Sequence, residues 1–162
     1  MFCVTHHRFG LWNKGRLAII LALVLALLTT SCGSISEDAV LVTRVIDGDT
    51  IEIEGGYRVR YIGIDTPERG EPYYIEASKA NRNLVEGQKV RLEKDVEDKD
   101  KYGRLLRYVW VNNTMVNAEL VRLGYAYSYP YPPNLEYQIY FLQLEKEARQ
   151  HKRGLWSMKS NV

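Results

Sequence analysis

Residues 40–64 read V-L-V-T-R-V-I-D-G-D-T-I-E-I-E-G-G-Y-R-V-R-Y-I-G-I, and their pattern is that of three β-strands. Apolar and polar residues alternate along most of the stretch, as they do in a strand with one buried face. Turn residues interrupt the alternation at Asp47–Asp49 and again at Gly55-Gly56. Three short strands joined by two glycine-containing turns predict an antiparallel meander.

The rest of the chain adds predicted helices and two further strands. A polar loop at 97–103 joins the two strands, and the helices are recognised by apolar residues at a 3.6-residue period. The predicted elements are strands at Lys89–Val96 and Arg104–Val111 and helices at about Tyr74–Val85, Val116–Leu123 and Leu135–Lys152, the last with Asn134 as its N-cap. The order βββαββαα predicts a mainly β protein with α-helices (α+β). We expect residues 40–158 to form a five-stranded OB-type Greek-key barrel with three helices.

Charged side chains interrupt the apolar faces of the predicted strands. Alternation gives three sets of residues that share a face: Val40, Val42, Arg44 and Ile46; Asp49, Ile51 and Ile53; and Arg58, Arg60, Ile62 and Ile64. If the isoleucines point into the barrel, Asp49 and Arg60 point inward near strand ends. A buried unpaired charge is costly, so each of the two should pair, bind an ion or line a cleft. A purely structural Asp49–Arg60 pair at the barrel rim is the alternative.

Residues 1–32 have the features of a signal peptide. A basic beginning leads into the apolar run Leu17–Leu28, whose 12 residues fall short of the ~20 needed to span a bilayer. The end of the run resembles a bacterial lipoprotein signal, in which Cys32 becomes the lipidated first residue. Cleavage by the ordinary signal peptidase and a retained anchor are the alternatives. Residues 33–39 would be a tether, and the domain would be exported, either lipid-anchored to the cell envelope or secreted.

Composition excludes several kinds of site from the domain. Both cysteines, Cys3 and Cys32, lie in the leader, which leaves no disulfide, Cys nucleophile or Cys-based metal site beyond it. His151 is the only histidine after residue 32, and its sequence context predicts a solvated helix end rather than part of a Ser-His-Asp triad. Residues 33–162 contain 19 basic and 20 acidic residues, a net charge of −1. Nucleic acid would therefore have to be bound through a local patch or a metal.

Three short motifs concentrate charged residues at predicted turns and strand ends. They are V-I-D-G-D-T at 45–50, R-Y-I-G-I-D-T-P-E at 60–68 and D-K-Y-G-R at 100–104. The first two also have a structural interpretation, because D-G-D-T is a common hairpin turn and Asp-Thr-Pro-Glu can begin a helix. Together the motifs contain the residue types needed to bind and cleave a phosphodiester. Carboxylates hold Ca²⁺ or Mg²⁺, two arginines can fork onto phosphate oxygens, and a glutamate can orient or deprotonate water.

In their order along the chain these motifs resemble the staphylococcal (thermonuclease) nuclease family. The resemblance covers about residues 40–157 and includes M-V-N-A-E-L-V-R-L-G-Y-A at 115–126, Y-P-Y-P-P-N at 129–134 and G-L-W-S at 154–157. It implies an OB barrel with three helices and a nuclease that uses one Ca²⁺ ion to cleave DNA and RNA. Water would break the P–O5′ bond by in-line attack and leave 3′-phosphate products.

The resemblance also implies a role for each site residue. Asp49, Asp65 and the backbone carbonyl of Thr66 would ligate the metal, with Asp47 as a nearby carboxylate; Arg60 and Arg104 would bind the scissile phosphate and Glu68 would act on the attacking water; Lys101, Tyr102, Tyr129 and Tyr131 would bind substrate. The segment 69–76 is shorter than in well-known members and lacks their lysines and glycines.

We expect a monomer that favours single-stranded substrates and that meets a membrane only through an N-terminal lipid anchor. Two other functions stay open. The chain could be a non-catalytic nucleic-acid- or protein-binding OB barrel, or a surface lipoprotein that sequesters Ca²⁺.

Overall fold

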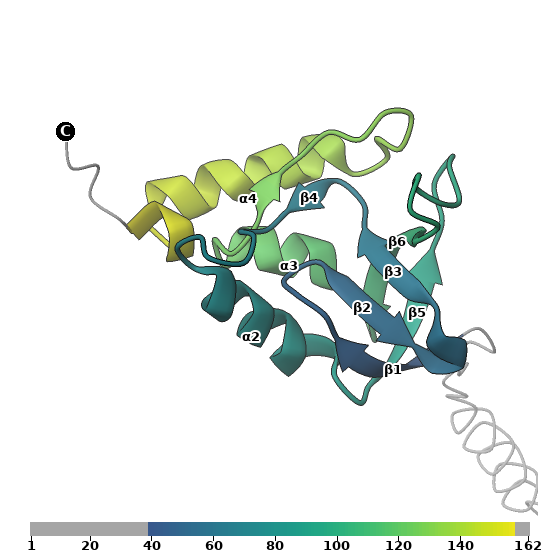
Figure 1. Ribbon diagram of the computed structural model, residues 1–162. Helices are drawn as coiled ribbons and strands as arrows, with labels where there is room; N and C mark the ends of the chain where they lie inside the picture. Colours follow the sequence, from purple (N-terminus) through teal and green to yellow (C-terminus); the bar gives the residue numbers. More distant parts are fainter. Residues whose placement is uncertain (1–38, 158–162) are drawn as a thin grey trace, which may run out of the picture. The chain divides into compact units, whose positions relative to one another are not determined.

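The computed structural model describes residues 39–157, which form a closed β-barrel with helices beside it (Figure 1). One sheet contains β1 (Ala39–Val45), β2 (Thr50–Ile53), β3 (Arg58–Tyr61), β5 (Lys89–Glu93), β6 (Leu105–Val111) and β7 (Thr114–Met115), in the order β3-β2-β1-β5-β6-β7. A parallel pairing between β3 and β6 closes the barrel. The predicted five-stranded OB-type barrel is confirmed, and the two-residue strand β7 extends it at β6.

The α-helices lie on one side of the barrel (Figure 1). They are α2 (Tyr74–Val85), α3 (Val116–Arg122) and α4 (Gln138–Gln150), accompanied by the 3₁₀ turn η2 (Gly154–Ser157) and a small antiparallel pair of β4 (Ile64–Asp65) with β8 (Tyr127–Ser128). A second 3₁₀ turn, η1 (Glu54–Gly56), connects β2 to β3 in the barrel. The three predicted α-helices are therefore present. Within residues 39–157, no helix is both long and apolar enough to cross a membrane.

The core joins the barrel interior to the inner faces of the helices. Large side chains that are almost completely buried include Tyr61 and Tyr108 from the barrel, Leu120 from α3 and Phe141 from α4. Burying one such side chain contributes about 1.5–3 kcal/mol to stability. Strands β2, β3 and β4, which flank the first two charged motifs, are thus fixed to a packed core.

Simple alternation fails in β1 because the strand contains a bulge. The pairing of β1 with β2 shifts register between Val42 and Arg44. After the bulge it is Val45 that is buried, whereas Arg44 is exposed and forms an ion pair with Glu52 at 2.9 Å. The prediction that Arg44 shares a face with Val42 was therefore wrong, because one extra residue reverses the alternation.

Alternation also fails in the third strand, which is shorter than predicted. β3 ends at Tyr61, and its buried side chains are Val59 and Tyr61, so Arg60 belongs to the opposite parity. Gly63, with φ 77°, separates β3 from β4. A Cβ at Gly63 would lie 2.6 Å from Phe141 Cε2, which explains why glycine stands at this break. The predicted shared inward face of Arg60, Ile62 and Ile64 is therefore wrong, although both isoleucines are buried.

Two predicted boundaries and one predicted cap also differ. The last helix begins at Gln138 rather than Leu135, and its N-cap position is Tyr137. Asn134 is buried and instead accepts a hydrogen bond at Oδ1 from the backbone N–H of Glu97, at 2.7 Å. Strand β5 ends at Glu93 and not at Val96. The sequence patterns thus located these elements but missed the tertiary hydrogen bonds that set their ends.

Candidate active site

Arg60 joins two carboxylates that come from different elements. Its Nη1 pairs with Oδ2 of Asp49, which directly precedes β2, and its Nη2 lies 2.7 Å from Asp65 Oδ1, in β4. The side chain of Arg60 is 16% exposed and that of Asp65 is 42% exposed. The pairing predicted for Asp49 and Arg60 is present, and it lies where solvent can still reach Asp65 and the arginine.

Asp49 is fixed by donors from a neighbouring segment. Its Oδ2 accepts hydrogen bonds from the backbone N–H of Thr66 at 2.9 Å and from Thr66 Oγ1 at 2.8 Å. Its Oδ1 accepts a hydrogen bond from Thr50 Oγ1 at 3.2 Å. The turn before Asp49 needs glycine, because a Cβ at Gly48 would lie 2.6 Å from Thr66 Oγ1. Hydrogen bonds between Asp49 and Thr66 therefore join the D-G-D-T and D-T-P-E motifs in the folded protein.

Negative charge is concentrated around this arginine. Asp47 Oδ1 accepts a hydrogen bond from the backbone N–H of Asp49 at 3.1 Å, so the first aspartate shapes the turn. Burial, and next the charge of Asp49, raise the pKa of Asp47 to about 6. Burial also raises the pKa of Asp65, and Arg60 only partly opposes this. Two carboxylates thus pair with a single guanidinium and Asp47 lies close behind Asp49, an arrangement that favours an additional cation.

The second arginine is positioned by a loop that Asp100 organises. Asp100 Oδ2 accepts a hydrogen bond from Arg104 Nε at 2.7 Å, and its Oδ1 accepts backbone N–H bonds from Tyr102 at 2.9 Å and Arg104 at 3.0 Å. Gly103, with φ 80°, permits the tight turn. Within residues 39–157 the guanidinium donates hydrogen bonds only through Nε, and its Cζ lies 5.6 Å from the centre of the Tyr102 ring, so Nη1 and Nη2 of Arg104 can bind a ligand. Asp100 was missed as a site residue, although its place in D-K-Y-G-R was a usable signal.

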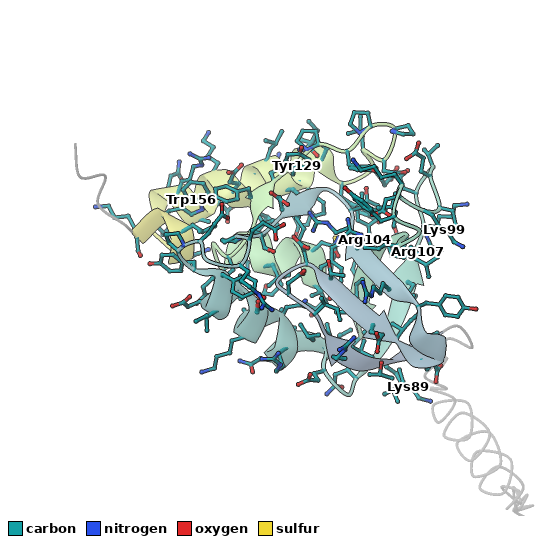
Figure 2. The ribbon with its side chains drawn as sticks, in the orientation of Figure 1. Lys89, Lys99, Arg104, Arg107, Tyr129 and Trp156 are labelled. Carbon is teal, nitrogen blue, oxygen red and sulfur yellow. The ribbon has the colours of Figure 1, made fainter. Side chains whose placement is uncertain are left out.

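A cavity of about 230 Å³ gathers residues from the second and third motifs, at 60–68 and 100–104, and from the Y-P-Y-P-P-N segment. Its lining includes Arg60, Asp65, Asp100, Arg104, Tyr129 and Tyr131. Tyr129 follows β8 and Arg104 precedes β6, and both lie near β4 (Figure 2). The structure therefore brings the two predicted arginines and the two predicted tyrosines to one cavity.

Glu68 lies in a second, more open concavity of about 690 Å³, which also contains Arg104. The glutamate side chain is exposed, and its backbone N–H donates to Glu71 Oε2 at 2.7 Å. Tyr102 lines the same concavity, and Lys101 Nζ lies 5.0 Å from the centre of the Tyr102 ring. Arg104 thus lines both hollows, with Tyr129 and Tyr131 in the first cavity and Glu68 in the second concavity.

The donor set around Asp49 and Asp65 fits a hard cation only with help from other oxygens. Within residues 39–157 there is no group of three or more His, Cys, Asp or Glu side chains that could hold a metal ion. Asp49 and Asp65 pair with the two terminal nitrogens of one guanidinium, so their carboxylates converge on one small region. Two carboxylates completed by backbone or water oxygens are typical of Ca²⁺ coordination.

This fold and this site define a barrel that can bind and act on phosphodiesters, and comparison with known proteins agrees. Residues 58–158 match the family model described as "Staphylococcal nuclease homologue". The chain is 44% identical over 128 residues to a thermonuclease of Staphylococcus intermedius, covering 74% of this chain and 76% of that protein. It is 41% identical to a thermonuclease of Staphylococcus hyicus, covering 75% and 78% of the two chains.

A third relative is Endonuclease YncB of Bacillus subtilis strain 168, which is 42% identical over 134 residues and covers 76% of this chain and 64% of the relative. The chain therefore belongs to the staphylococcal nuclease family, as the motifs indicated, and it is a nuclease. The predicted signal peptide, the tether up to residue 38 and the lipidation of Cys32 lie outside the described residues.

Proposed function

We propose that the protein is a Ca²⁺-dependent nuclease that hydrolyses DNA and RNA at the P–O5′ bond and leaves 3′-phosphate products. The observation that carries this proposal is the convergence of Arg60, Asp65 and Arg104 on one cavity. Two arginines are suited to the charge of a phosphodiester, and guanidinium groups can bind phosphate oxygens in pairs. Histidine takes no part in the proposed chemistry.

The two arginines would bind the scissile phosphate and stabilise the charge that develops during attack. Arg104 has both terminal nitrogens free of other hydrogen bonds within residues 39–157, and Asp100 fixes its direction. Arg60 is bound to Asp49 and Asp65, so it must share or release a carboxylate when it meets a phosphate. Preorganised donors of this kind usually supply the largest part of catalysis at charged centres.

Asp49, Asp65 and the backbone carbonyl of Thr66 would hold one Ca²⁺ ion, with Asp47 as a nearby carboxylate. The excess of carboxylates over guanidinium groups and the raised pKa values of Asp47 and Asp65 support this assignment. The bound ion would supply positive charge at a phosphate oxygen. The hydrogen bonds from Thr66 orient the Asp49 carboxylate before any ion arrives.

Glu68 would orient and deprotonate the attacking water. Its exposed carboxylate lines the concavity that Arg104 also lines, so water and the phosphate can both be reached from that side. In-line attack places nucleophile and leaving group on opposite faces of the phosphorus. This agrees with a general base on one side of Arg104 and a nucleoside cavity on the other.

Substrate contacts would extend from the scissile phosphate in both directions. Tyr129 and Tyr131 would contact a base and sugar, while Lys101 and Tyr102 would contact a further phosphate. Exposed aromatic rings bind unpaired bases by stacking, which favours single strands. We further propose that the protein is exported, carries a lipid on Cys32 or is released by signal cleavage, and acts as a monomer.

The test is cleavage of single-stranded DNA and RNA by the purified protein, with Ca²⁺, with Mg²⁺ and with chelator, beside Arg104→Ala. Ca²⁺-dependent cleavage that Arg104→Ala reduces by about 10²-fold or more is expected from the loss of a transition-state contact. End-group analysis should find 3′-phosphates. A folded, metal-binding protein that binds these substrates without cleaving them would instead be the non-catalytic OB barrel.

A further inference from the structure

The second concavity carries residues that the proposed mechanism does not use. Besides Glu68, Arg104 and Tyr102, it is lined by Tyr57, which follows η1, and by Arg58, the first residue of β3. Tyr57 is 59% exposed and Tyr102 is 72% exposed. Exposed aromatic rings that lie beside positive charge can stack on nucleic-acid bases. Here two of them, together with two arginines, surround one open hollow next to the site.

The Tyr57 ring packs next to Gly55 rather than projecting freely into solvent. η1 ends at Gly56, and Gly55 has φ 84°. A Cβ at Gly55 would lie 2.9 Å from Tyr57 Cε2, so the ring packs over the glycine. The Tyr57 ring is therefore held against the backbone of η1 while more than half of the residue stays exposed, which suits a stacking contact with a base.

Within the described residues, no ion pair neutralises the positive charge of Arg58. It lies opposite Glu52 in the β2–β3 register, but Glu52 pairs with Arg44 of β1 instead, at 2.9 Å. Within residues 39–157, Arg58 has no acidic partner and its side chain is exposed. An unpaired guanidinium next to Arg104 favours a ligand with more than one negative charge.

A phosphodiester joins two nucleosides, and two hollows meet at Arg104. The cavity on one side contains Tyr129 and Tyr131, and the concavity on the other contains Tyr57 and Tyr102. We propose that the concavity of Tyr57, Arg58 and Tyr102 is a second nucleotide subsite. Tyr57 stacks on the base across the scissile phosphate from the Tyr129–Tyr131 cavity, and Arg58 binds the next phosphate of the strand. This inference rests on the proposed function.

The test for Tyr57 compares dithymidine monophosphate with its two analogues that lack one thymine. Base–aromatic stacking is worth ~1–3 kcal/mol, so Tyr57→Ala should raise KM for the dinucleotide by about tenfold and leave kcat within about twofold. Against the analogue that lacks the stacked base, Tyr57→Ala should change nothing. Against the other analogue it should raise KM as it does for the dinucleotide. Tyr140→Ala removes a tyrosine that is exposed on α4 and is the matched control.

Arg58→Ala is tested on a twelve-residue thymidylate. It should raise KM and make the slope of log KM against log salt concentration shallower by about 0.7, as expected for one lost phosphate contact on a single strand. Lys89→Ala removes an exposed charge away from Arg104 (Figure 2) and should leave the slope unchanged. Two results would refute the subsite while the nuclease stands, provided that wild type cleaves the dodecamer. In the first, Tyr57→Ala lowers the rate equally for both analogues. In the second, Tyr57→Ala leaves the rate unchanged for every substrate. If wild type cleaves nothing, both proposals fail.

Discussion

At the scale of single residues, replacing Arg60 by lysine separates the geometry of the guanidinium from its positive charge. Arg60 uses two nitrogens on two carboxylates, which a lysine ammonium cannot reproduce with the same fork. We expect Arg60→Lys to lower kcat by about 10²-fold, because a bidentate phosphate contact is lost while a positive charge remains. Steady-state kinetics would measure this, and circular dichroism would confirm the fold. A variant with wild-type kcat would remove Arg60 from the mechanism.

Asp100 is expected to act through Arg104. Burial alone would raise the pKa of Asp100, but hydrogen bonds from the Arg104 side chain and from the backbone N–H groups of Arg104 and Tyr102 outweigh it and hold the pKa below its usual range. We expect Asp100→Asn to lower kcat/KM by about tenfold or more, since the guanidinium is no longer aligned with its ligand.

The same residue predicts a pH dependence of stability. A carboxylate whose pKa is lowered by folding contributes stability above its unfolded pKa, and the contribution disappears as the pH falls through the folded pKa. The free energy of unfolding of Asp100→Asn should therefore be lower than that of wild type by about 1–3 kcal/mol at pH 7. The difference should shrink as the pH falls below ~4. Urea unfolding of both proteins at pH 7 and below pH ~4 measures this difference in the free energy of unfolding. A difference that does not change with pH would contradict the ion-pair explanation.

At the scale of elements, the break between β3 and β4 is essential for the site, because it lets Asp65 turn back toward Arg60. Gly63 has φ 77° and touches Phe141, whereas Gly87 has φ 73° and no atom within 4 Å of an added Cβ. Alanine at either position carries the strain of a left-handed residue, about 1–2 kcal/mol. Gly63→Ala adds a clash with the core, so it should destabilise by about 1–3 kcal/mol more than Gly87→Ala. Equal unfolding free energies for the two variants would show that the contact with Phe141 relaxes freely.

Most elements were predictable because local signals agreed with the tertiary structure. Residues 74–85 form a helix with the predicted bounds, since apolar period and following glycine coincide there. Alternation failed at Arg44 and at Arg60, where a bulge and an early strand end reverse the parity. Nevertheless Asp49 and Arg60 do pair, because the cost of an unpaired buried charge does not depend on which strand face it starts from. The role of Asp100 depends on hydrogen bonds that no periodicity reports.

At the scale of the whole molecule, cation binding should be linked to the stability of the folded barrel. The proposed ligands lie just before β2 and at the end of β4, which are brought together only by folding, so an ion that binds there stabilises the native state. At a Ca²⁺ concentration about 100 times Kd the gain is about 2.7 kcal/mol, which corresponds to a rise in Tm of several degrees.

Asp65→Asn should remove that rise while preserving the fold, because Asp65 is half exposed, whereas Asp49 also anchors Thr66 through two hydrogen bonds. We therefore expect Asp65→Asn to match wild type in chelator and to gain little from Ca²⁺, and Asp49→Asn to be less stable in both conditions. Asp98→Asn, which changes an exposed carboxylate paired with Arg107 at 2.7 Å, is the control and should retain the full Ca²⁺ effect. Thermal unfolding with and without Ca²⁺ measures all four proteins. A full Ca²⁺ shift in Asp65→Asn would place the ion elsewhere, because a cation that binds only the folded state must lose affinity when one of its two charged ligands is neutralised.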